Sequence, residues 1–108
     1  MNVIINRKIR QYLVHSFLYY QLNESIISDS HFDLICKDLS SFIKKNSHIN
    51  FLPYEEILKN SLSNDASGFK IRKFPAEIIS AALHLLYQHK YRESLTFENF
   101  LARFGYRL

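Results

Sequence analysis

The sequence predicts an all-α fold in one small domain, and three observations lead to this prediction. Apolar residues recur three and four positions apart along most of the chain, which is the spacing of amphipathic helices. Only two Gly and two Pro occur in 108 residues, which disfavours a β-rich or loop-rich fold. Hydrophobic residues make up 47% of the chain, enough for one modest core. We therefore expect a single helical domain over residues 1–108.

Residues 1–45 are predicted to form an antiparallel helical hairpin. The apolar stripe of a first helix, over about residues 3–22, consists of Ile5, Ile9, Tyr12, Leu13, Phe17 and Tyr20. The stripe of a second helix, over about residues 29–45, consists of Phe32, Ile35, Cys36, Leu39, Phe42 and Ile43. Ser28 is the expected N-cap, and Lys44 and Lys45 suit the negative end of the second helix. The connector is short, so the two helices should run antiparallel, with Cys36 as a buried, inert thiol.

Residues 46–108 are expected to add about three further helices to this hairpin. Pro53 suits the first turn of a third helix, which should end before the turn signal Ser-Asn-Asp-Ala-Ser-Gly at residues 63–68. A fourth helix should begin at Pro75 and run to about Lys90. Its sequence is apolar around most of the circumference, so we expect it to be the central helix.

The last predicted helix is short and covers residues 97–104. Thr96 precedes it and can cap its N-terminus through its hydroxyl oxygen. Gly105 follows it and fits the left-handed conformation that often ends a helix.

Charge and composition restrict the classes of partner and the location. The net charge of +4 is divided equally between residues 1–54 and 55–108, so it permits nucleic-acid contact without arguing for it. No apolar run approaches the ~18 residues that span a bilayer, so we expect no membrane partner. The polar, helix-periodic start over residues 1–13 does not resemble a signal peptide, and we expect a cytoplasmic protein. One cysteine and five scattered histidines predict neither a disulfide nor a metal site.

Residues 19–33, Tyr-Tyr-Gln-Leu-Asn-Glu-Ser-Ile-Ile-Ser-Asp-Ser-His-Phe-Asp, carry most of the functional information. Two adjacent aromatic residues end the first predicted helix, and two carboxylates and a third aromatic open the second. Aromatic faces beside negative charge suit a flat cationic ring that bears a sugar, because both attract a cation. Nicotinamide in its oxidised form is such a ring. The candidate ligand-binding residues are Tyr19, Tyr20, Asp29, Phe32 and Asp33.

The same stretch resembles the N-terminal domain Ia of bacterial NAD-dependent DNA ligases, over about residues 9–43. The family pattern has a Tyr-Tyr or Tyr-His pair, a short loop, an Ile-Ser/Pro-Asp step and then Glu-Tyr-Asp. The resemblance implies that the domain grips the nicotinamide mononucleotide half of NAD. Tyr19 would stack on the nicotinamide, and Tyr20 would sit beside the phosphate or ribose. Asp29 and Asp33 would hydrogen-bond to the carboxamide or the ribose hydroxyls.

Two residues depart from the family pattern. Phe32 stands where the family has a tyrosine, so a hydroxyl that could meet the phosphate is lost. His31 stands where the family has a glutamate, which removes a capping box and supplies a group that can carry positive charge. The stacking and acidic contacts survive these changes, whereas the phosphate contact does not follow from the pattern.

Ligation by this chain alone is excluded by its glycines. The adenylation domain of the ligases needs a Lys-x-Asp-Gly nucleophile motif, but the only glycines here, Gly68 and Gly105, follow Ser67 and Phe104. The same scarcity rules out glycine-rich phosphate loops and helix-hairpin-helix DNA-binding elements. We therefore expect no enzyme activity, with NAD or nicotinamide mononucleotide as the candidate ligand and no metal.

Four interpretations remain open from the sequence. The first is a stand-alone module that senses or sequesters a nicotinamide nucleotide, or assists a separate adenylation domain. The second is a small adaptor or inhibitor that binds a host or partner protein through its fourth and fifth helices, and a composition rich in Asn, Ile, Lys and Ser fits a phage origin. The third is nucleic-acid binding through Lys70, Arg72 and Lys73, with Phe69 and Phe74 on either side of them, and through residues 90–92. The fourth is purely structural, with the two tyrosines in the core and the two aspartates serving only the helix terminus and the surface.

Overall fold

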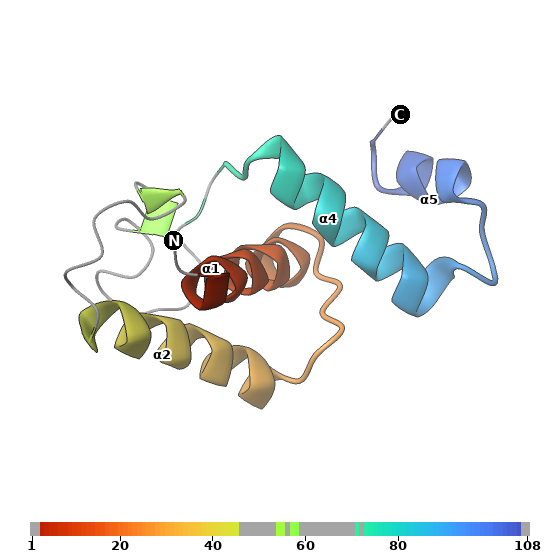
Figure 1. Ribbon diagram of the computed structural model, residues 1–108. Helices are drawn as coiled ribbons and strands as arrows, with labels where there is room; N and C mark the ends of the chain where they lie inside the picture. The colour runs from red at the N-terminus through yellow and green to blue at the C-terminus, as the bar shows by residue number, and fades with distance from the viewer. Residues whose placement is uncertain (1–2, 46–53, 56, 59–70, 72, 107–108) are drawn as a thin grey trace.

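In a computed structural model, residues 3–45, 54–55, 57–58, 71 and 73–106 are described. Their elements are, in chain order, α1 (Val3–Ser16), the π-helical segment η1 (Phe17–Gln21), α2 (Asp29–Lys45), α4 (Ala76–Leu86), the π-helical segment η2 (Tyr87–Tyr91) and α5 (Phe97–Arg103) (Figure 1). Within these ranges every regular element is helical. The all-α prediction is therefore confirmed.

The helices α1 and α2 form the antiparallel hairpin that the sequence predicts. Tyr19, at the end of the first helical run, stacks on Phe32 at the start of α2, whereas Lys8, near the start of α1, pairs with Asp38 further along α2. The N-cap is also the predicted one, because the Ser28 hydroxyl oxygen accepts a hydrogen bond from the His31 amide at 3.1 Å. Local signals at both ends of α2 therefore determined its bounds.

The central helix is α1, so the expectation that the fourth helix would be central is wrong. Figure 1 shows α1 between α2 and α4, and it contacts both of them. Three consecutive residues of α1, Tyr12, Leu13 and Val14, are buried. Successive side chains are about 100° apart around a helix, so these three cover more than half of the circumference of α1. On α4, by contrast, Ser80 and His84 are exposed, which leaves one side of that helix open.

Both long helical runs end in a wider turn that the sequence did not predict. The Leu22 amide donates to the Phe17 carbonyl at 3.3 Å, and the Arg92 amide donates to the Tyr87 carbonyl at 2.8 Å. Each of these bonds spans five residues instead of four, as in a π-helix. The predicted helical extents to about residues 22 and 90 are nevertheless correct.

Most of the predicted third helix lies outside the described residues, as do Pro53 and the turn over residues 63–68. Within the described part, the Leu58 amide donates to the Tyr54 carbonyl at 3.1 Å, which is a helical hydrogen bond. The Leu58 side chain is buried in the core. This short piece therefore agrees with the predicted helix and adds Leu58 to the core.

The C-terminal helix α5 has the predicted bounds and the predicted caps. The Thr96 hydroxyl oxygen accepts from the Asn99 amide at 3.1 Å, and Gly105 adopts a left-handed φ of 83°. The amides of Gly105 and Tyr106 donate back to the carbonyls of Ala102 and Leu101, so the helix ends in a Schellman motif. These bonds satisfy carbonyls at the end of α5, which contacts η2.

The core joins all these elements in one cluster. It includes the buried Cys36, as predicted, and Phe100, whose side chain is fully buried. The ring of Phe100 lies 5.1 to 5.9 Å from four other aromatic rings, those of Tyr87, Tyr91, Phe97 and Phe104. These contacts hold α5 against η2. The aromatic residues at the start of α2, on the other side of α1, belong to a separate group.

Candidate functional site

An aromatic cluster forms where α1 passes into α2, and it consists of Tyr19, Tyr20 and Phe32. The rings of Tyr19 and Phe32 are stacked, with centroids 5.1 Å apart and planes 14° from parallel. The ring of Tyr20 is tilted against Tyr19 at 4.8 Å and meets Phe32 edge-on at 6.0 Å. Phe32 is buried, and both tyrosines are half-buried.

Local structure explains why these three residues meet. The two tyrosines lie in η1, and the wide π turn holds both side chains on the side that faces α2. Phe32 lies in the first turn of α2, which follows a connector of only a few residues. The sequence therefore predicted their proximity correctly, because the connector is short enough to bring the two helix ends together.

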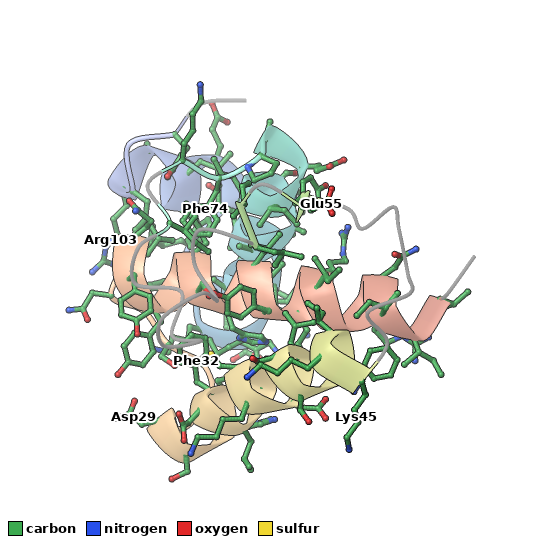
Figure 2. All side chains as sticks on the ribbon, turned by 90° about the vertical axis from the view of Figure 1, so that its left-hand side faces the viewer. Asp29, Phe32, Lys45, Glu55, Phe74 and Arg103 are labelled. Atoms are coloured by element: carbon green, nitrogen blue, oxygen red, sulfur yellow. The ribbon has the colours of Figure 1, made fainter. Side chains whose placement is uncertain are left out.

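The two predicted carboxylates differ in what they contact. Hydrogen bonding to Asp29, together with the negative charge of that carboxylate, raises the pKa of Tyr19. Asp33 instead pairs with Lys37 at 2.9 Å and raises the pKa of that lysine. Figure 2 shows Asp29 and Phe32 at one end of α2, with Lys45 at the other. Asp29 is therefore part of the aromatic cluster, whereas Asp33 lies one turn away on the exposed surface.

This arrangement determines what the cluster can do chemically. One face of Tyr19 is covered by Phe32, so a flat ligand would have to use the remaining exposed part of the tyrosine pair. Phe32 is only 5% exposed, so its role is to hold the Tyr19 ring in place from behind. A negative charge at Asp29 beside an aromatic face favours a cationic ring over a neutral one.

Sequence reasoning missed a polar link centred on Glu24. This carboxylate accepts a hydrogen bond from the Tyr91 hydroxyl at 2.8 Å and forms an ion pair with Lys90 at 3.1 Å. The link ties the connector after η1 to η2. No sequence signal could have found it, because its partners lie 66 and 67 positions away.

Sequence reasoning also missed two surface depressions that lie between helices. One, between α4 and α5, has a volume of about 390 Å³ and is lined mostly by apolar side chains. The other, between α1 and α4, has a volume of about 280 Å³ and is lined by cationic and apolar side chains. Each is formed by residues from two helices, so neither could be found before the packing was known.

The basic stretch over residues 70–73, the predicted nucleic-acid contact, is described only in part. Lys70 and Arg72 lie outside the described residues, and Lys73 is exposed. Phe74 is buried and packs edge-on against Phe17 at 5.2 Å. Its ring serves the core and is not available to stack on a base.

The described residues contain no candidate for a metal site or a membrane span. Over the ranges that the structure describes, no group of three or more His, Cys, Asp or Glu side chains could hold a metal ion. Among the same residues, each helix is too short or too polar to cross a membrane. No protein-family model, curated protein or solved structure matches this chain.

Proposed function

We propose that this protein is a non-catalytic module that binds the nicotinamide mononucleotide part of NAD at the aromatic cluster. The observation that carries the proposal is the arrangement around Tyr19, whose ring is stacked on Phe32 and whose pKa is raised by Asp29. A rigid aromatic face beside a carboxylate is suited to a flat cationic ring. The resemblance to ligase domain Ia over residues 9–43 supports the same ligand.

The proposed contacts assign a role to each predicted residue. The oxidised nicotinamide ring stacks on the exposed part of Tyr19 beside Tyr20, and Phe32 supports the stack from below. The Asp29 carboxylate interacts with the positive ring or its carboxamide. Asp33 exchanges its surface contact with Lys37 for a ribose hydroxyl. Such a module would sense or sequester the nucleotide, or present it to a separate adenylation domain, and the ligand is consistent with a cytoplasmic location.

Isothermal titration with nicotinamide mononucleotide and with NAD tests this proposal. We expect saturable binding that is lost in Tyr19→Ala and strongly weakened in Asp33→Ala. Asp38→Ala is the matched control, because Asp38 is another exposed carboxylate of α2 and pairs with Lys8, away from the cluster. Absence of heat with either ligand, or equal binding by Tyr19→Ala, would refute the site.

A comparison of the two redox forms of the nucleotide tests the role of charge. The reduced nicotinamide ring has lost its positive charge. It therefore gains no charge attraction from Asp29 and no cation–π attraction from the faces of the tyrosines. We expect the reduced mononucleotide to bind more weakly than the oxidised one. In Asp29→Asn this preference should shrink, because the substitution removes the charge and keeps the shape of the side chain. Equal affinity for the two forms in the native protein would contradict the cation-based mechanism.

The second candidate function is an adaptor or inhibitor that binds a host protein, as for a phage-encoded factor. The observation that favours it is the apolar groove between α4 and α5, with Ile79, Leu83, Phe97 and Leu101 in its lining. These are the two helices on which the sequence placed such a surface, and the groove is large enough for an apolar side chain of a partner. The half-buried Ile79 is the residue to change. Ile79→Lys should abolish capture of a host protein that the native chain retains, whereas unchanged capture would refute this surface.

A further inference from the structure

The groove between α1 and α4 combines positive charge with an apolar floor. Its lining consists of Arg7, Arg10, Gln11, Val14 and His15 from α1 and of Leu85 from α4. The five α1 residues are spaced so that they share one face of the helix. The groove therefore follows the axis of α1, and Leu85 of α4 borders it on the other side.

All the polar groups in this lining are nitrogen donors or neutral groups, and none is a carboxylate. The three ion pairs among the residues that the structure describes all involve lysines, so neither Arg7 nor Arg10 pairs with a described carboxylate. Val14 is 6% exposed and Leu85 is half-buried, so part of the groove wall excludes water. Charge-assisted hydrogen bonds are stronger beside such a surface than in open solvent.

The environment of His15 disfavours a positive charge on its ring. Burial lowers the pKa of His15, and the charges of His31 on α2 and His89 on η2 lower it further. When they are charged, His31 and His89 therefore repel a positive charge on His15 at this end of the groove. An anion would relieve this repulsion and would favour the charged form of His15.

We propose that the groove binds the phosphate group of a small phosphorylated molecule, with Arg7 and Arg10 as its ligands. The guanidinium group offers planar, paired N–H donors that match two oxygens of a phosphate. The volume of about 280 Å³ is suited to a phosphate with a small substituent. This site uses none of the residues of the aromatic cluster, so it stands independently of the proposed nicotinamide site.

A titration of the isotope-labelled full chain with inorganic pyrophosphate at low ionic strength, followed by NMR, tests this proposal. We expect saturable shifts of the side-chain signals of Arg7, Arg10 and His15. The double variant Arg7→Gln/Arg10→Gln should bind about tenfold more weakly or worse, which corresponds to about 1.4 kcal/mol. The control is Lys44→Gln/Lys45→Gln, which removes the same charge from the exposed end of α2. Both pairs are on the surface, so the fold should persist, and circular dichroism verifies this.

The possible outcomes separate this site from others. Shifts that do not saturate, or an equal loss of affinity in the control, would overturn the proposal, because general positive charge would then explain the binding. Tighter binding of a single-stranded oligonucleotide than of pyrophosphate, with loss of that binding in the arginine variant, would assign the groove to a nucleic-acid backbone. This result would overturn the small-molecule ligand. Tyr19→Ala should retain pyrophosphate binding, so failure of the nicotinamide site would not be mistaken for failure of this one.

Discussion

The hydrogen bond between Tyr91 and Glu24 should stabilise the fold by coupling two segments that are distant in sequence. Tyr91→Phe removes only the hydroxyl that donates to the Glu24 carboxylate at 2.8 Å. The aromatic contacts of the ring with Phe100 and Phe104 and the stacking of Arg103 over it remain possible in the variant. Any loss of stability therefore reports the polar link and not the packing.

The expected magnitude follows from the exposure of the two partners. A hydrogen bond to a charged group contributes about 1.5–3 kcal/mol when water is excluded. The Glu24 side chain is 22% exposed and Tyr91 is half-buried, so competition from water reduces this to about 1 kcal/mol. Glu24→Ala also removes the ion pair with Lys90, whose side chain is 45% exposed, and this adds about 0.5 kcal/mol. We thus expect losses of about 1 kcal/mol for Tyr91→Phe and about 1.5 kcal/mol for Glu24→Ala.

A double-mutant cycle measured by urea unfolding tests this reasoning. The double variant should lose about 1.5 kcal/mol, so the coupling energy should be about 1 kcal/mol. Additivity of the two single losses within about 0.3 kcal/mol would show that the two side chains do not interact, and would refute the link.

The pH dependence of unfolding provides a second measurement of the same link. The hydrogen bond to Glu24, with burial as a smaller cause, raises the pKa of Tyr91, so folding favours the neutral hydroxyl. This contribution is complete below the unfolded pKa of about 10 and is lost as the pH rises through the folded pKa. The stability of the native chain should therefore fall more steeply above about pH 10 than that of Tyr91→Phe. Tyr19, whose pKa is shifted in the same direction, is present in both proteins and cancels in the comparison.

Three further changes test other parts of the structure. The folded pKa of His15 is lowered by burial and by His31 and His89, so the free energy of unfolding should fall as the pH drops below about 6.5. An equally steep fall of the free energy of unfolding with pH in a His15→Gln variant would contradict this. Phe100→Ala should cost about 3–5 kcal/mol in urea unfolding because the ring is fully buried among four others, whereas a loss near that of an exposed phenylalanine would disprove its central role. Gly105→Ala should cost about 1 kcal/mol, since φ is 83° and the added Cβ meets no atom within 4 Å, and Gly105→Asn should recover part of this loss.

The parts of the fold that depend on local signals could be predicted from the sequence. The bounds of α2 follow from Ser28 at one end and from two lysines at the other, and the Thr96 and Gly105 caps define α5 in the same way. The π turns could not be predicted, because a hydrogen bond that spans five residues leaves almost the same apolar pattern as one that spans four. The central position of α1 was also missed, because the apolar pattern of one helix does not show how many neighbours it will contact.

The candidate site could likewise be predicted from the sequence only in part. Tyr19, Phe32 and Asp29 could be predicted to meet because a short connector joins their helices. The pairing of Asp33 with Lys37 follows from their spacing on one helix, but no sequence signal favours it over contact with a ligand. The cationic groove depends on how α4 lies against α1, which is tertiary information that the sequence does not supply locally.

The two π-helical segments also make the chain tolerant of changes in length. A turn closed by a bond across five residues contains one residue more than an ordinary α-helical turn, so each segment can release one residue and remain hydrogen-bonded. Successive residues of a helix are separated by about 100° of rotation, so such a deletion in η1 would turn the tyrosine pair away from Phe32. The same deletion in η2 would turn Tyr91 away from Glu24. A chain shortened by one residue at either place would therefore keep the arrangement of α1, α2 and α4 and present a different surface at its edge.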